Sequence, residues 1–378
     1  MEQRKNSAET SQKLHMPAKE RMANLELLRI VSMLFVIVLH FIGKSSNHPN
    51  LTDADMAPWE YGAWALESFS IVAVNVYMLL TGYLLADSPF KIKRLVQLWL
   101  QLLFYSAGIG LVAALLGYVP EEGMSVYYLA QLFLPVSTNH YWFMTAYILM
   151  YLFLPAVLLG VTKLSKKQFQ MLLGLLFFAF CGIKSVSPIK LTTDMQGYDC
   201  IWYLCMVLLA AYIRLYGIPF FKSKTRSLLV YAGSATLIFG VTLLLRMVYL
   251  RTGKLGDMVT VCFNYNHILV VLAALGFFML FLQISIKSGL VSKWICKIAP
   301  YTLGVYLWHE NIAIRYEWPL WIQNLLGGAT EGVMWFAALT VSVAAVFVIG
   351  ILLDVLRSLL FKGVHKGLLH IVEGVNKK

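Results

Sequence analysis

Long apolar stretches recur along this sequence, and they limit the folds that the chain can adopt. A helix that crosses a bilayer needs about 20 predominantly apolar residues. Ten segments meet or approach that length: 25–43, 62–85, 95–117, 141–160, 169–183, 200–217, 227–249, 266–286, 299–316 and 332–360. The fifth is short and the ninth contains polar residues. The series predicts an all-α, polytopic integral membrane protein with about ten transmembrane helices.

The charged residues support this interpretation and suggest an orientation. Hydrophobic residues make up 59% and charged residues 13% of the chain, against about 45–50% and 25% in soluble domains. Lysine and arginine cluster in the amino-terminal tail, in alternate loops and in the carboxyl-terminal tail. Basic loops stay on the cytoplasmic side. Ten helices with both termini in the cytoplasm agree with this rule at every loop. The same clusters account for the net charge of +12, and we expect no nucleic-acid partner because no basic face carries interleaved aromatic residues.

The sequence divides into three parts. Residues 1–24 form a polar cytoplasmic tail without the features of a signal peptide, 25–360 form the transmembrane domain, and 361–378 form a basic cytoplasmic tail. No loop is long enough for a separate soluble domain, so the membrane domain must carry any chemistry.

The five cysteines lack metal-ligand spacing, and we expect no metal site. Aromatic residues at helix ends, including Trp142, are interpreted as interfacial.

The first apolar segment carries ionisable residues at both ends. In RIVSMLFVIVLH, Arg29 and His40 are eleven residues apart, which is about three helical turns or about 16 Å, so both lie on one helix face. Glu26 shares that face and either pairs with Arg29 or extends towards the aqueous surface. Ionisable residues within membrane helices face a cavity or the bundle interior. This favours function for His40 over a purely structural hydrogen bond.

The same helix, NLELLRIVSMLFVIVLHF, resembles the first helix of the acyltransferase-3 family of integral membrane O-acyltransferases. The hallmark of that family is arginine or lysine, ten residues and histidine, which Arg29 and His40 match. AVNVYMLLTGYLL resembles its second helix, with Asn75 at an Asp/Asn position and Thr81-Gly82 where Ser-Gly is commoner.

Further motifs extend the resemblance along the chain. KIKR at 91–94 is similar to a basic pair in the family's first cytoplasmic loop, with Lys91 replacing the usual arginine. HYWFMTAYILMYLFLP (140–155) and TLGVYLWHENI (302–312) resemble its fourth-helix and late-helix segments. At the level of topology the resemblance covers about residues 22–360.

The resemblance implies an activity. Members of the family move an acyl group, usually acetyl, from cytoplasmic acyl-CoA to a hydroxyl of a glycan or lipid-linked saccharide at the outer side of the bacterial plasma membrane. Acyl-CoA is then a substrate, and no tightly bound cofactor is expected. His40 would be the catalytic base or a transient acyl carrier. Arg29 would stabilise the oxyanion or, as we favour, position CoA.

Several polar residues are expected to support this chemistry. Lys91 and Arg94 share a face where a helix begins, which suits CoA phosphates, although ordinary positive-inside charge explains them equally. Glu67 either orients His40 or faces water, and Asn75 is a supporting polar residue. His309, beside a glutamate, either lines the cavity or forms a hydrogen bond between helices.

Two other functions fit a polytopic helical protein. A transporter or flippase of lipid-linked saccharides commonly has internal repeats and paired broken helices, and the sequence shows neither. A polysaccharide polymerase is expected to have a large outer loop, which the sequence lacks. Dependence on acyl-CoA separates acyl transfer from both.

Overall fold

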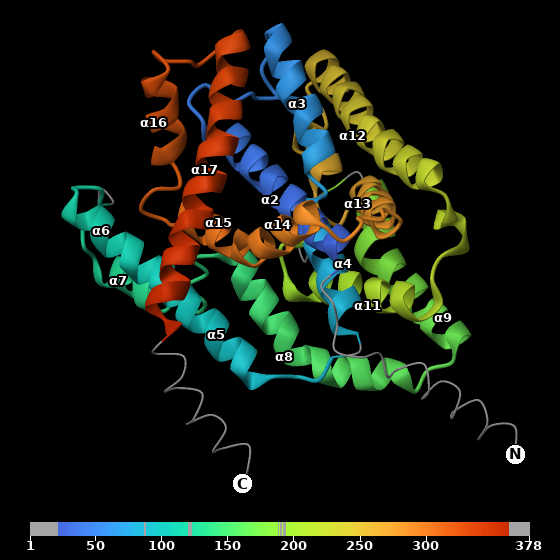
Figure 1. Ribbon diagram of the computed structural model, residues 1–378. Helices are drawn as coiled ribbons and strands as arrows, with labels where there is room; N and C mark the ends of the chain where they lie inside the picture. Colours follow the sequence, from blue (N-terminus) through green and yellow to red (C-terminus); the bar gives the residue numbers. More distant parts are fainter. Residues whose placement is uncertain are drawn as a thin grey trace, which may run out of the picture.

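The computed structural model describes residues 22–362, except 87, 120–122, 188, 190, 192 and 193. These residues form helices joined by short connections, with no strand in the described part (Figure 1). The prediction of an all-α polytopic protein is confirmed. The two predicted tails, 1–24 and 361–378, lie almost entirely outside the described residues.

The elements follow one another along the chain, and those labelled η are short π-helical or 3₁₀ segments. They are α2 (Ala23–Lys44), α3 (Pro58–Ser70), α4 (Ala73–Leu85), α5 (Ile92–Leu103), η1 (Phe104–Ile109), α6 (Gly110–Leu115), α7 (Val126–Phe133), α8 (Trp142–Thr162), α9 (Lys166–Phe177), η2 (Phe178–Gly182), α10 (Ile183–Val186), α11 (Cys200–Tyr216), η3 (Pro219–Lys222), α12 (Lys224–Thr252), η4 (Gly256–Met258), η5 (Val261–Phe263), α13 (Ile268–Leu282), α14 (Leu290–Ile298), η6 (Ala299–Tyr301), α15 (Thr302–His309), α16 (Glu317–Leu325) and α17 (Gly332–Leu360).

Eight helical stretches in the described part are long and apolar enough to cross a membrane. They are Ala23–Lys44, Pro58–Leu85, Ile92–Leu115, Trp142–Thr162, Lys166–Val186, Lys224–Thr252, Gly256–Leu282 and Gly332–Leu360. The apolar helix α11 is shorter. Together with α11, these stretches correspond to every predicted segment except 299–316.

The predicted helix over 299–316 is wrong in its second half, because α15 ends at His309. Two N–H groups that would continue the helix bind side chains instead. The backbone N–H of Ile312 donates to Nε2 of His140 at 3.2 Å, and that of Ala313 donates to Oδ1 of Asn311 at 2.9 Å. The chain then turns into α16, leaving Glu310 at the end of a half-helix.

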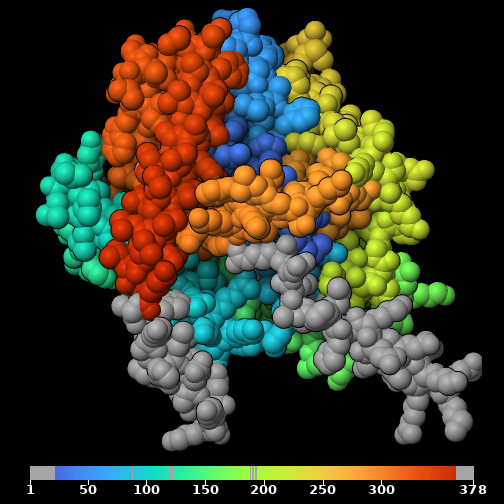
Figure 2. Space-filling model, in the orientation of Figure 1, coloured from blue at the N-terminus to red at the C-terminus, as the bar shows by residue number. Residues whose placement is uncertain are grey.

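Helix α2 lies inside the bundle. It packs against α3, α4, α13, α14, α15 and α17. In Figure 1, α14 and α15 cross the middle of the molecule, and Figure 2 shows them, in orange, lying across α2 so that little of its surface remains visible. The polar stripe of α2 is therefore enclosed by protein rather than by lipid.

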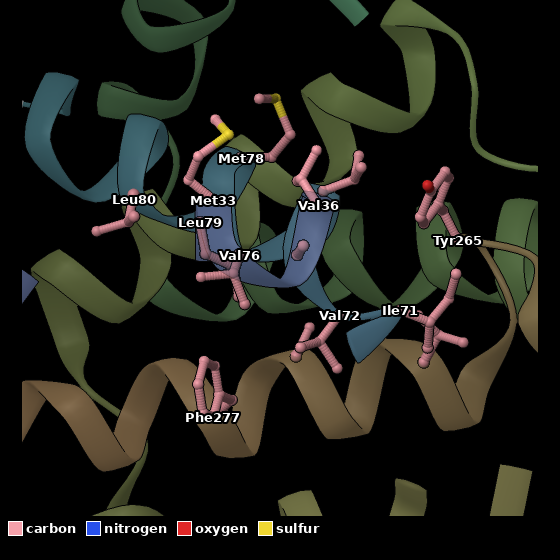
Figure 3. Packing of buried hydrophobic residues seen from close by; sticks show 14 of the residues in the cluster. Met33, Val36, Ile71, Val72, Val76, Met78, Leu79, Leu80, Tyr265 and Phe277 are labelled. Atoms are coloured by element: carbon pink, nitrogen blue, oxygen red, sulfur yellow. The ribbon is translucent and has the colours of Figure 1, made fainter. Parts of the chain in front are cut away.

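Apolar side chains hold this central packing together. Met33 and Val36 of α2, Val76 and Leu79 of α4, and Phe277 of α13 belong to one buried cluster (Figure 3). Between helices in lipid there is little hydrophobic driving force, so close packing carries the association. The fixed neighbours of α2 set the position of its ionisable residues.

Helix α4 in turn lies very close to α11. A Cβ atom at Gly82 would lie 2.5 Å from the carbonyl oxygen of Val207. Only glycine permits this approach of the two backbones, and the glycine of the Thr81-Gly82 motif therefore has a packing role.

Candidate active site

A cavity of about 250 Å³ lies among α2, α4, α5, α8 and the η6–α15 segment. Helix α2 contributes four residues to its lining: Arg29, Met33, Val36 and His40. Their spacing of three and four residues is that of one helix face. The predicted common face of Arg29 and His40 is thus confirmed. Arg94 from α5 lines the same cavity. One continuous space therefore joins two arginines to the histidine.

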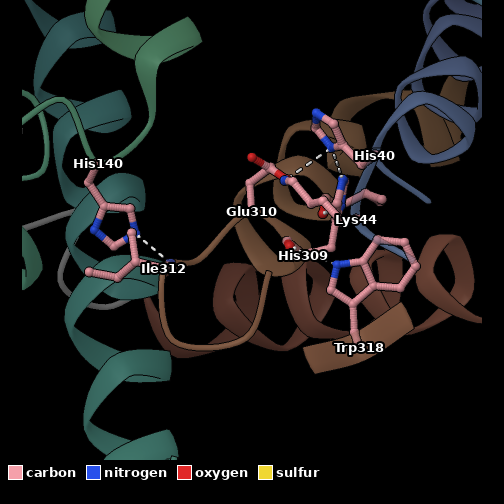
Figure 4. Close-up of polar contacts among 8 residues, drawn as sticks. His40, Lys44, His140, His309, Glu310, Ile312 and Trp318 are labelled. Carbon is pink, nitrogen blue, oxygen red and sulfur yellow. Dashed lines mark hydrogen bonds and ion pairs between the residues drawn. The ribbon is translucent and has the colours of Figure 1, made fainter. Parts of the chain in front are cut away.

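At the His40 end, the last residue of α15, His309, and the C-cap residue that follows it, Glu310, contact the imidazole. Nδ1 of His40 lies 2.8 Å from Nε2 of His309 and 3.1 Å from Oε1 of Glu310. Lys44, one turn further along α2, forms an ion pair with Glu310 (Figure 4). His309 and Glu310 are both buried, so the ion pair of Glu310 with Lys44 lies away from bulk water.

The hydrogen bonds define which nitrogen of His40 is free. Nδ1 of His309 lies 2.6 Å from the carbonyl oxygen of Val305, which can only accept, so this nitrogen carries a proton. In a neutral imidazole, Nε2 of His309 then accepts a hydrogen bond from Nδ1–H of His40. His40 is left with its lone pair on Nε2 and Glu310 beside its protonated nitrogen. That arrangement makes His40 a proton acceptor.

The same group has a donor set that suits a metal ion. The ligand atoms of His40, His309 and Glu310 lie within 4.8 Å of one another. In the arrangement described, however, the two imidazoles bind each other, and Lys44 supplies the positive charge beside Glu310. The carboxylate is therefore neutralised without a cation from solution.

At the other end of the cavity the charges are more accessible. Arg29 forms an ion pair with Glu26 at 2.5 Å and its side chain is 27% exposed, which confirms the paired alternative for Glu26. Arg94 donates to the hydroxyl of Tyr147 at 3.2 Å. Lys91 is exposed at the N-cap of α5 and does not line the cavity. Of the basic residues considered for the donor, Arg29 and Arg94 line the cavity and Lys91 does not.

Glu67 does not orient His40. Within the described residues it forms no ion pair with His40, and it lies instead within electrostatic range of Tyr198 and Tyr265. The reason is the packing of α15 on α2, which brings Glu310 to His40. Of the two alternatives for Glu67, pairing with His40 is therefore the one that the structure contradicts.

Asn75 is fully buried and acts as a structural link. Its amide donates to the carbonyl oxygen of Tyr265 at 2.7 Å and accepts from Nε1 of Trp202 at 2.9 Å. Tyr265 lines the cavity, as does Trp142, which sequence reasoning assigned to the membrane interface. Asn75 thus ties α4 to the cavity wall and to α11.

His140 holds the turn after α15 in place. Its Nδ1–H donates to the carbonyl oxygen of Gln131 at 2.9 Å, and its Nε2 accepts from Ile312. Burial lowers the pKa of His140 to about 4, so the ring stays neutral and both bonds persist at physiological pH. Through Ile312, His140 fixes the position of Glu310.

Two residues of the site were missed in the sequence. Lys44 follows His40 by four residues, and Tyr306, which lines the cavity, precedes His309 by three. Both spacings place side chains on the same helix face. The sequence signal for Lys44 and Tyr306 is therefore a polar residue three or four positions from a histidine.

A polytopic helical bundle that encloses such a histidine is the framework of an integral membrane enzyme. A family model described as an acyltransferase domain matches residues 22–355, nearly the whole chain. The chain belongs to the acyltransferase-3 family and is a membrane acyltransferase. Neither the curated proteins nor the solved structures gave a match to it.

Proposed function

We propose that the protein transfers an acetyl group from cytoplasmic acetyl-CoA to a hydroxyl of a glycan or lipid-linked saccharide at the outer face of the bacterial plasma membrane. The observation that supports this most directly is the single cavity lined by Arg29 and Arg94 at one end and His40 at the other. Membership of the acyltransferase family favours this function over the transporter alternative.

The arginine end suits the donor. Arginine recognises phosphate through several donors in a fixed geometry, and Arg94 belongs to a basic cluster that the positive-inside rule assigns to the cytoplasm. Glu26 partly neutralises Arg29, so Arg94 carries the greater share of phosphate binding in this proposal. Arg29 and His40 are about 16 Å apart along α2, and in this proposal the extended pantetheine arm spans that distance.

The histidine end suits the chemistry. Nε2 of His40 takes the proton of the acceptor hydroxyl as the oxygen attacks the thioester carbonyl carbon. Glu310, beside Nδ1, stabilises the imidazolium that forms, the role of the carboxylate in a catalytic triad. When the tetrahedral intermediate collapses, the carbon–sulfur bond breaks and His40 returns the proton to the CoA thiolate. The ester and free CoA are the products.

A covalent route uses the same lone pair. If His40 carries the acyl group, its Nε2 attacks the thioester carbonyl carbon, the carbon–sulfur bond breaks and CoA leaves. The acceptor hydroxyl then attacks acyl-His40, the carbon–nitrogen bond breaks, and the imidazole takes the hydroxyl proton. The two routes differ in one observable: only the second leaves labelled acetyl on the protein when acceptor is omitted.

The test uses membrane vesicles with the cytoplasmic face exposed, native glycan and radiolabelled acetyl-CoA. We expect wild-type vesicles to label glycan and His40→Ala vesicles to lose at least about 10²-fold of that rate, the usual contribution of a general base. His48→Ala changes an exposed histidine outside the cavity and should behave as wild type. Transfer that is independent of His40, or no transfer from any short acyl-CoA, would refute the proposal.

A further inference from the structure

The cavity contains a buried hydroxyl whose proton has no acceptor in the described part of the chain. Tyr306 is 5% exposed, and its side chain lines the cavity. Among the described residues no acceptor lies within hydrogen-bonding distance of its hydroxyl. Burying a hydroxyl proton without an acceptor is unfavourable, so such a hydroxyl at a cavity wall points to a ligand that accepts from it.

A second source of positive potential reaches the same place. Helix α8 begins at Trp142, and its N-cap residue, Tyr141, provides no side-chain cap. The first three residues of α8, Trp142, Phe143 and Met144, line the cavity. Their N–H groups precede the first intrahelical hydrogen bond of the helix. The backbone N–H of Phe143 lies close to the hydroxyl oxygen of Tyr306, which can accept from it, and the hydroxyl proton is then left to donate to a ligand. The positive end of the dipole of α8 is thus directed towards the tyrosine.

Both features lie beside the proposed base. The ring of Tyr306 is 6.3 Å from that of His40 and 5.7 Å from that of Phe143, measured between centroids. His40 also lines the cavity. A carbonyl group attacked by an oxygen that His40 deprotonates must lie within a few ångströms of its imidazole, and hence close to both Tyr306 and the start of α8.

We propose that the hydroxyl of Tyr306 and the amino terminus of α8 form the oxyanion-binding site for the acyl carbonyl. This inference rests on the proposed function. As the acceptor oxygen bonds to the carbonyl carbon, the π electrons of the carbonyl move onto its oxygen. Tyr306 O–H and the α8 N–H groups donate hydrogen bonds to that oxygen. The charge returns to carbon when the carbon–sulfur bond breaks, and Tyr306 keeps its proton throughout.

In this arrangement Arg29 need not both position CoA and bind the oxyanion. Arg29 lies about three turns from His40 along α2 and is paired with Glu26, so it is too distant to bind the oxyanion formed at His40. Preorganised donors at the point where charge develops contribute strongly to acyl transfer. Tyr306 and α8 provide them at the correct end of the cavity.

The test compares Tyr306→Phe with Tyr128→Phe in the vesicle assay. Tyr128 is 2% exposed and its hydroxyl is likewise unpaired among described residues, but it does not line the cavity. Both changes remove one oxygen and keep the ring. We expect kcat to fall about 10²-fold in Tyr306→Phe, the usual effect of one lost oxyanion donor, with KM for acetyl-CoA unchanged. Tyr128→Phe should retain the wild-type kcat.

Binding of CoA itself, which has no acyl carbonyl, reports the integrity of the cavity. Tyr306→Phe should bind CoA as wild type does. A kcat within about twofold of that of Tyr128→Phe, or a loss of CoA binding, would overturn the oxyanion role. If wild-type vesicles show His40-dependent transfer while Tyr306→Phe keeps its rate, only this inference fails. If wild-type vesicles transfer nothing, the proposed function fails.

Discussion

The two ends of the cavity differ in how their charges are held. At one end, Arg29 is 27% exposed and pairs with a residue of its own helix. At the other end, residues far apart in sequence interlock: His40 contacts His309 and Glu310, and the side chain of Glu310 is 7% exposed. Exposed ion pairs are weak and adaptable, whereas buried networks fix geometry. The difference indicates that one end holds a flexible ligand and the other positions a reaction.

Among the changes that compare the two ends, the largest effect is expected from removing the carboxylate at the His40 end. Glu310→Gln should lower kcat about 10- to 10²-fold, since the imidazolium loses its partner and Lys44 is left unpaired, while His309 still fixes the tautomer. The measurement is the initial rate at saturating acetyl-CoA. Glu331→Gln, at an exposed position, is the matched control. A Glu310→Gln rate equal to that of the control would show that the two ends do not differ in this way.

A smaller effect of another kind is expected at the arginine end. Arg94→Ala should raise KM for acetyl-CoA about 10-fold without changing kcat, because one phosphate contact is lost; this change corresponds to about 1.4 kcal/mol of binding free energy. Lys91→Ala removes a charge of the same cluster that lies outside the cavity, and should change neither constant. Equal effects of the two variants would mean that the cluster acts through general electrostatics. A fall in kcat alone for Arg94→Ala would contradict a binding role.

The smallest effect is expected from chelators. Because Lys44 neutralises Glu310 and the two imidazoles bind each other, incubation with EDTA should leave the transfer rate unchanged. Metal analysis of the purified protein provides the second readout. Loss of activity with EDTA and recovery with a divalent cation would show that the residues of this end hold a metal ion during turnover.

Features that depend on local periodicity could be predicted from the sequence. The lengths of the apolar stretches predicted the long helices correctly except for segment 299–316. Helical spacing placed Arg29 and His40 on a common face. These inferences need only residues within one helix. They do not depend on how helices meet, which explains their success.

Features that depend on tertiary contacts could not be predicted. The end of α15 is determined by His140, far away in sequence, which binds Ile312. The choice of Glu310 over Glu67 follows from the packing of α15 on α2. Similarly, Lys91 and Arg94 are equivalent by spacing, but only Arg94 turns out to line the cavity. A single sequence does not indicate which of these residues contact one another in the folded protein.

The ion pair between Lys44 and Glu310 has a consequence for energy coupling. With that pair neutral, the proton that His40 accepts is balanced by the charge on the oxyanion, and it returns to the departing thiolate. The acetyl group that travels along the cavity is uncharged. Moving one elementary charge across a membrane at 100 mV involves about 2.3 kcal/mol, but under the proposed mechanism no net charge moves in that field. Transfer would then proceed at the same rate in an energised and in a depolarised membrane, driven by the thioester alone.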